Sequence, residues 1–102
     1  MDDVRALMRA LGAKKSEISV YLALYRRGPA TVRDLVERTG LSERTVRVAL
    51  RSLLNGGYVS VEKSGRSNVY SAVSPSVISQ KFRKKVEEYF SSMFTRLRSR
   101  SS

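Results

Sequence analysis

The 102-residue sequence contains neither cysteine nor histidine. The chain therefore has no thiolate or imidazole metal ligands, no disulfide bonds and no Ser-His or Cys-His pair for nucleophilic catalysis. No pair of acidic residues is placed for acid-base catalysis either. We therefore expect a protein that is not an enzyme and that has no metal or other cofactor.

Long apolar segments are missing as well. The first residues, MDDVRALMRALG, lack the basic region and the continuous apolar run of a secretory signal. No stretch of 18 apolar residues occurs anywhere, so no membrane-spanning helix is predicted. We expect a soluble, cytoplasmic protein.

Negative charge is scarce. Nine Asp and Glu residues oppose 20 Lys and Arg residues, which gives a net charge of +11, and both halves of the chain share the excess. A field of this sign attracts polyanions, so nucleic acid is the expected partner and an anionic membrane surface is the less favoured one. The length is that of one small domain.

Apolar spacing predicts four helices in the first 55 residues. Residues 3–11 and 15–27 each carry an apolar stripe, and Gly28-Pro29 ends the second helix. The stripe of the second helix consists of Ile18, Tyr21, Leu22 and Tyr25. Thr31, three residues before Asp34, predicts a capping box at the start of a short helix that ends before Gly40. Ser42 is expected to cap a fourth helix, about 42–55. Two short helices joined by a glycine-bearing turn form a helix-turn-helix.

The apolar period changes to two after residue 57. Residues 58–63 and 67–73 are rich in β-branched and aromatic side chains and predict a β-hairpin with Gly65 and Arg66 in its turn. Ser74 and Pro75 then fit the first positions of a final helix of about 23 residues.

This order of elements resembles the winged helix-turn-helix DNA-binding domain. The segment LGAKKSEISVYLALYRRGPATVRDLVERTGLSERTVRVALRSLLNGGYVSV is similar to the amino-terminal domain of archaeal TrmB-like regulators and of the related MarR and ArsR types. The resemblance implies a mainly α fold with a small hairpin wing. It assigns residues 1–74 to a DNA-binding domain, with a recognition helix at about 42–55 and a wing at about 58–73. We expect residues 75–102 to form a C-terminal dimerisation helix and basic tail.

The chain also departs from these families. Lys14 stands where TrmB-like proteins usually have a capping Thr or Ser. The 102 residues do not hold the sugar-sensing domain of the larger TrmB-like proteins, and the Cys and His ligands of ArsR-type metal sensors are missing. Neither sugar sensing nor metal sensing is carried over, and a small-molecule effector stays unknown.

A helical wheel of residues 42–55 separates an apolar face from a basic one. Burying Val46, Leu50 and Leu53 places Arg44, Val48 and Arg51 on the opposite side. In helix-turn-helix proteins the beginning of this helix reaches base edges, and in winged-helix families the hairpin contacts the backbone or minor groove. The predicted DNA-binding residues are Thr31, Ser42, Glu43, Arg44, Thr45, Arg47, Val48, Arg51, Lys63, Arg66 and Ser67. The alternatives are a solvated helix face, ordinary turn chemistry at the hairpin, and a purely capping role for Thr31.

The final helix carries a longer apolar stripe than one small domain can cover, and such a surface usually marks an interface. We expect a homodimer, with the alternative that the helix folds back onto its own domain. The predicted interface residues are Val4, Leu7, Met8, Leu11, Ile78, Phe82, Val86, Tyr89, Phe90, Met93, Phe94 and Leu97.

Together these features predict a nucleoid-associated homodimer that binds double-stranded DNA and regulates transcription as a repressor. Two alternatives remain. A sequence-tolerant architectural protein of chromatin would also be strongly basic. A winged helix that docks onto other proteins would not need its basic recognition helix.

Overall fold

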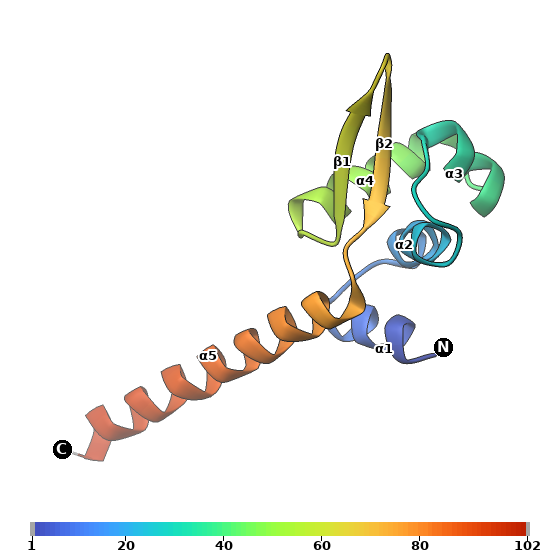
Figure 1. Ribbon diagram of the computed structural model, residues 1–102. Helices are drawn as coiled ribbons and strands as arrows, with labels where there is room; N and C mark the ends of the chain where they lie inside the picture. The colour runs from blue at the N-terminus through green and yellow to red at the C-terminus, as the bar shows by residue number, and fades with distance from the viewer. Residues whose placement is uncertain (1, 102) are drawn as a thin grey trace.

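The computed structural model describes residues 2–101 and, within them, the side chains of residues 4–96. The elements are α1 (Asp2–Ala10), α2 (Lys15–Arg27), α3 (Val32–Thr39), α4 (Glu43–Asn55), β1 (Val59–Ser64), β2 (Ser67–Ala72) and α5 (Pro75–Ser101) (Figure 1). The predicted elements are all present, with boundaries within one or two residues of those expected. The exception is α5, which has 27 residues where about 23 were expected.

Local sequence sets the ends of these helices. The Thr31 hydroxyl accepts a hydrogen bond from the Asp34 N–H (3.2 Å), and the Asp34 carboxylate accepts one from the Thr31 N–H (3.1 Å), so the predicted capping box is confirmed. Gly40 ends α3 in the left-handed conformation, with φ 73° and ψ 6°. At the start of α2, the Glu17 carboxylate accepts from the Lys14 N–H at 2.8 Å and satisfies a helix-end donor.

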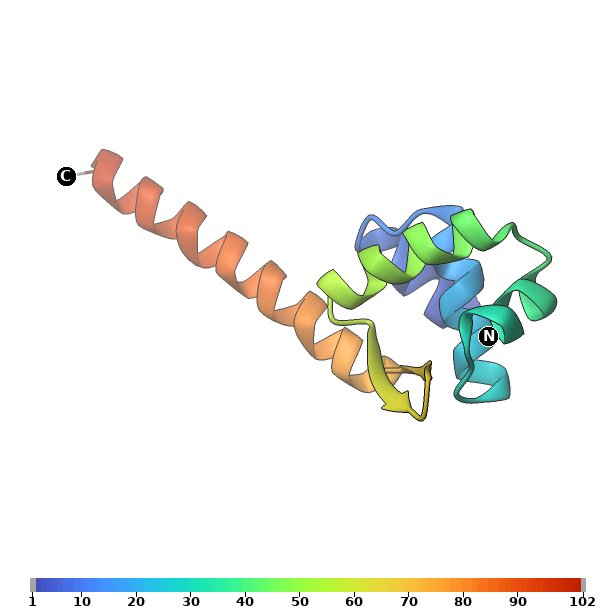
Figure 2. The same cartoon turned by 90° about the horizontal axis from the view of Figure 1, so that it is seen from above.

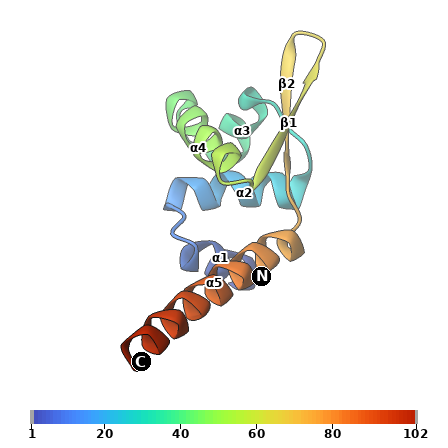
Figure 3. The ribbon, with the colours of Figure 1, turned by 90° about the vertical axis from the view of Figure 1, so that its left-hand side faces the viewer.

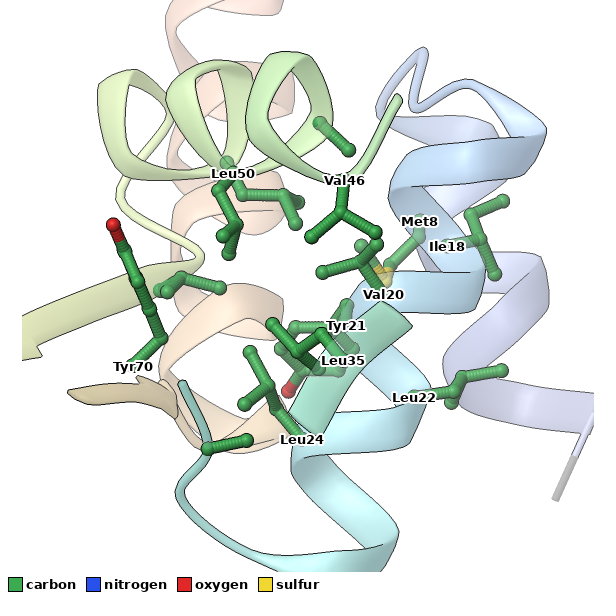
Figure 4. Close-up of a cluster of buried hydrophobic side chains, with 14 of the residues drawn as sticks. Met8, Ile18, Val20, Tyr21, Leu22, Leu24, Leu35, Val46, Leu50 and Tyr70 are labelled. Carbon is green, nitrogen blue, oxygen red and sulfur yellow. The ribbon is translucent and has the colours of Figure 1, made fainter. Parts of the chain in front are cut away.

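The hydrophobic core surrounds α2, which contacts α1, α3, α4 and β2. Tyr21 and Leu24 of α2, Leu35 of α3 and Leu50 of α4 belong to one buried cluster (Figure 4). The Tyr21 hydroxyl also donates to the backbone carbonyl of Val73, two residues before α5 (2.5 Å). The central helix is therefore joined both to the helix-turn-helix and to the point where α5 leaves the domain.

The two strands form an antiparallel hairpin, the wing. Its register leaves Gly65 and Arg66 as a two-residue turn, in which Gly65 has a φ of 62° and Arg66 does not have a positive φ. This pattern is that of a type II′ turn, which suits the twist of a hairpin. Ala30, between α2 and α3, pairs with Tyr70 of β2 through two backbone hydrogen bonds of 2.9 and 2.8 Å. The wing is thereby held beside the beginning of α3.

Helix α5 projects away from the rest of the molecule (Figures 1 and 2), which gives overall dimensions of 60 × 28 × 23 Å. Figures 1 and 3 show α1 and α5 on the other side of α2 from the tip of the wing. The amino group of Lys81 donates to the carbonyls of Gly56 and Gly57 (3.2 and 3.3 Å), so the beginning of α5 is tied to the end of α4. No described helix is long and apolar enough to cross a membrane.

Three predicted placements need correction. Met8 and Ile78, expected at a dimer interface, are 0% exposed in the single chain, because the first turns of the apolar stripe pack into the chain's own core. Tyr25, expected in the apolar stripe of α2, is 47% exposed and stacks on Tyr21 with ring centroids 6.1 Å apart.

Candidate nucleic-acid interface

Helix α4 turns a basic face to solvent. Val46 and Leu53 are buried in the core, which fixes the rotation of the helix about its axis. Arg44, Val48 and Arg51 consequently project outward, and Val48 is 56% exposed. A guanidinium can bond the acceptors of a guanine edge and a valine can contact a thymine methyl, so this face has the chemistry that reads a major groove.

Four of the predicted DNA-binding residues form two side-chain pairs at the beginning of α4. The Ser42 hydroxyl accepts from the Thr45 N–H at 3.1 Å and donates to the Thr45 hydroxyl at 2.9 Å, so both side chains take part in the helix cap. Nε of Arg47 donates to the Glu43 carboxylate at 3.2 Å. The two side chains of this ion pair are 59% and 68% exposed, so the pair contributes about 0–1 kcal/mol and a phosphate or base can replace it.

A concavity of about 340 Å³ lies between the beginning of α3, α4 and the wing. We call it the α3–wing concavity. Four of the predicted residues line it: Thr31 at the beginning of α3, Arg47 of α4, and Arg66 and Ser67 of the wing. The complete lining consists of Thr31, Val32, Arg33, Arg47, Arg66, Ser67, Asn68 and Tyr70.

Arg33 was not among the residues that the sequence predicted. It lies in the first turn of α3, is exposed, and adds a third guanidinium to the α3–wing concavity. Its place there depends on the pairing of Ala30 with Tyr70, a contact between residues 40 positions apart. The only local signal was its position two residues after the cap residue Thr31.

Thr31 and Lys63 have different surroundings. The hydroxyl of Thr31 accepts a hydrogen bond from the Asp34 N–H. The Thr31 N–H donates to the Asp34 carboxylate, and this bond, with a smaller contribution from the Thr31 side chain, holds the pKa of that carboxyl below its usual value. An ionised carboxylate therefore already occupies the positive end of α3, which disfavours a phosphate at the same place. Lys63 is exposed on β1 and does not line the α3–wing concavity.

The apolar side of α5 remains uncovered beyond its first turns. We call this surface the α5 stripe: Phe82, Val86, Tyr89, Phe90, Met93 and Phe94. Tyr89, Phe90 and Phe94 are 67%, 48% and 59% exposed. The rings of Tyr89 and Phe90 are packed edge to face with centroids 6.0 Å apart.

The predicted α1 residues adjoin this stripe. Leu11 lines a groove of about 490 Å³ with Val86 and Phe90, and Leu7 lines another of about 340 Å³ on the other side of Phe82. Val4 is half-buried against the core. The side chain of Leu97 lies outside those that the structure describes.

The helix-turn-helix, the paired hairpin beside it and the long final helix define the class: this is a winged helix-turn-helix protein. The family profile described as "Sugar-specific transcriptional regulator TrmB" matches residues 7–76. The chain therefore belongs to the TrmB family of DNA-binding transcriptional regulators.

Comparisons with individual proteins agree with this fold. The chain is 40% identical over 75 residues to the uncharacterized protein MJ1082 of Methanocaldococcus jannaschii, a match that covers 69% of this chain and 62% of the relative. It thus spans less than two thirds of that relative. Among solved structures it is similar to TrmBL2, an archaeal chromatin protein, with a TM-score of 0.75, 24% identity, and coverage of 89% of this chain and 36% of the other.

A second solved structure is the homodimeric winged helix-turn-helix domain of Mb0332 from Mycobacterium bovis, a possible ArsR-family regulator. Its TM-score is 0.59 at 21% identity, with 84% of this chain and 79% of that chain covered. At this identity the likeness establishes the fold.

Proposed function

We propose that this protein binds double-stranded DNA as a homodimer and represses transcription by occupying its site. The observation that carries the proposal is the basic face of α4 next to the α3–wing concavity. Arg44 and Arg51 face outward on α4, while Arg47 and Arg66 converge between that helix and the wing. A major groove that receives α4 would then have its flanking phosphates beside Arg66 of the wing.

The residues divide into two proposed roles. Arg44, Val48 and Arg51 are proposed to contact base edges, since their side chains project from the helix that would enter the groove. Arg33 and Arg66 are proposed to contact phosphates, which position the protein without reading sequence. Ser42, Glu43 and Thr45 support this surface through the helix cap and the ion pair with Arg47, and they reach DNA when those contacts are exchanged.

A homodimer would use the α5 stripe. Exposed aromatic side chains at helical spacing are stabilised when a second copy covers them. A two-fold dimer presents two recognition helices to major grooves about 34 Å apart, and its site is near-palindromic. The homodimeric state of Mb0332, which has the same fold, supports this assembly.

The test is fluorescence anisotropy at several salt concentrations. One duplex carries the sequence upstream of the protein's own gene, and the other has the same composition in shuffled order. Specific binding predicts an affinity at least ~10³-fold higher for the native duplex at physiological salt. Equal affinities with steep salt slopes would instead support sequence-tolerant coverage of DNA. The net charge of +11, spread along the chain, favours that second function.

A double variant separates α4 from general charge. In Arg44→Gln/Arg51→Gln the native duplex should bind at least about 30-fold more weakly, because each of the two base contacts by arginine contributes about 1–3 kcal/mol. The matched control Arg9→Gln/Lys84→Gln removes the same charge from exposed positions on α1 and α5, and its affinity should fall much less. Equal losses in the two variants would contradict the role of α4, and unchanged function in the first would favour a protein-docking module.

A further inference from the structure

A second basic hollow, of about 300 Å³, lies between α1, α2 and the C-terminal end of α3. We call it the flank hollow. Its polar lining comes from three helices and includes Arg5, Ser19, Arg26, Arg27 and Arg38. None of its lining residues lies on α4 or on the wing, so the proposed contacts with DNA do not account for it.

Part of the flank hollow is held in position by the fold. Nη1 of Arg38 donates to the backbone carbonyl of Gly28 at 2.8 Å, which orients the guanidinium and leaves further N–H donors on the same group. Arg5 and Arg38 are half-buried, whereas Arg27 is exposed. A guanidinium that is already oriented loses less side-chain freedom when it binds an oxyanion.

The side chains that line the flank hollow include four guanidinium groups, each with a positive charge. Among the residues that the structure describes, no acidic side chain lines it. Asp34 does not line the hollow, but its ionised carboxylate acts on Arg38 electrostatically and sets one negative charge against the four guanidinium groups of the lining. Guanidinium groups gathered around one hollow repel each other, and an anion among them relieves that repulsion. The planar donors of arginine match the oxygens of a phosphate.

We propose that the flank hollow is a phosphate-binding site separate from the recognition helix and the wing. Its volume of about 300 Å³ has room for a phosphate group. That group belongs either to the backbone of a second nucleic-acid segment or to a free phosphorylated molecule. The chemistry of recognition is the same in both cases, with Arg5 and Arg27 closing on the phosphate over the fixed guanidinium of Arg38.

The site is tested first with inorganic phosphate. ¹H–¹⁵N spectra of the full chain are recorded during a titration at constant ionic strength, with chloride as the comparison anion. Saturable shifts are expected at the amides of Ser19, Ala23 and Thr39, which line the hollow or its floor. In Arg5→Gln/Arg27→Gln the dissociation constant should rise at least tenfold. In Arg9→Gln/Lys84→Gln, which has the same net charge, it should stay within twofold.

A second measurement distinguishes the source of the phosphate. Protein bound to an immobilised duplex is incubated with a second, fluorescent duplex, and the amount of fluorescent duplex retained is measured. If the flank hollow takes nucleic acid, Arg5→Gln/Arg27→Gln should capture at least tenfold less than the control variant, while both variants bind a single duplex equally well. If capture is equal in both variants but phosphate binding is lost only in the first, the ligand is a free phosphorylated molecule.

Two results would overturn the proposal. The first is a phosphate titration whose shifts do not saturate at these amides. The second is an equal weakening in both double variants, which would mean that only net charge matters. The amide shifts report only on the surroundings of α1, α2 and α3, so this test is independent of the proposed DNA-binding function. If Arg44→Gln/Arg51→Gln had no effect on DNA binding, the results expected for phosphate binding would be the same.

Discussion

At the scale of single residues, Tyr21 joins the core to the start of α5. Its ring is 0% exposed and its hydroxyl donates to the Val73 carbonyl. Tyr21→Phe keeps the ring and leaves that carbonyl without its donor, so the free energy of unfolding should fall by about 1 kcal/mol. Urea denaturation measures the change. Tyr25→Phe is the matched control, because Tyr25 lies stacked on the same ring but is 47% exposed, and its loss should be within about 0.5 kcal/mol.

Because the Tyr21 hydroxyl is buried, we expect the free energy of unfolding to fall at high pH. Burial, with a smaller contribution from Tyr25, raises the pKa of Tyr21 from 10.0 to about 12. Since the folded pKa lies above the unfolded one, the stabilisation is complete below about pH 10 and is lost as the pH rises from about 10 to about 12. The urea midpoint should therefore fall further between pH 9 and pH 11 in the unaltered protein than in Tyr21→Phe. Parallel decreases in the two proteins would contradict this assignment.

At the scale of elements, Gly40 sets the turn between α3 and α4. Its φ of 73° is left-handed, and a side chain added there would meet no other atom within 4 Å. Gly40→Ala should therefore cost about 1–2 kcal/mol of folding free energy through backbone strain alone. Gly40→Asn should recover part of this loss, because asparagine tolerates the left-handed region better than alanine does. Chemical denaturation compares the three proteins, and an alanine variant as stable as the asparagine variant would show that strain is not the cause.

The elements themselves were largely predictable, because their signals are local. The capping pair of Thr31 and Asp34 and the left-handed Gly40 fixed the limits of α3, and the spacing of Val46, Leu50 and Leu53 fixed the side of α4 that is buried. Each of these features involves residues within one or two helical turns of one another. Residues that are close in the sequence are also close in space over such a length, so the pattern can be interpreted without knowing the fold.

The contacts between elements were less predictable. Arg33 was missed because its place beside the wing depends on a pairing with β2 that the local sequence does not encode. Met8 and Ile78 were assigned to an interface because a helical wheel identifies an apolar stripe without showing which part of it the same chain covers. The flank hollow could not be predicted for the same reason, since Arg5 and Arg38 are 33 positions apart in the sequence and meet only in the folded chain.

At the scale of the whole molecule, the α5 stripe predicts the state of assembly. Light scattering after size-exclusion chromatography should give twice the 11.5 kDa mass of the chain. Phe90→Glu/Phe94→Glu places two charges on the stripe and should give a single-chain mass, because a buried unpaired carboxylate disfavours association. Ser91→Glu/Thr95→Glu adds the same charge one residue further along, on the other side of α5, and should leave the mass doubled.

The same pair of variants connects assembly with DNA binding. A dimer binds its second half-site at a high effective concentration, so a protein that cannot dimerise should lose about 10²-fold or more in affinity for a two-half-site duplex. Its affinity for a single half-site should be unchanged, because α5 projects away from the part of the molecule that holds the recognition helix (Figure 2). A single-chain mass for the unaltered protein at micromolar concentration would refute the homodimer. The exposed aromatic side chains of α5 would then have to be covered by a different protein.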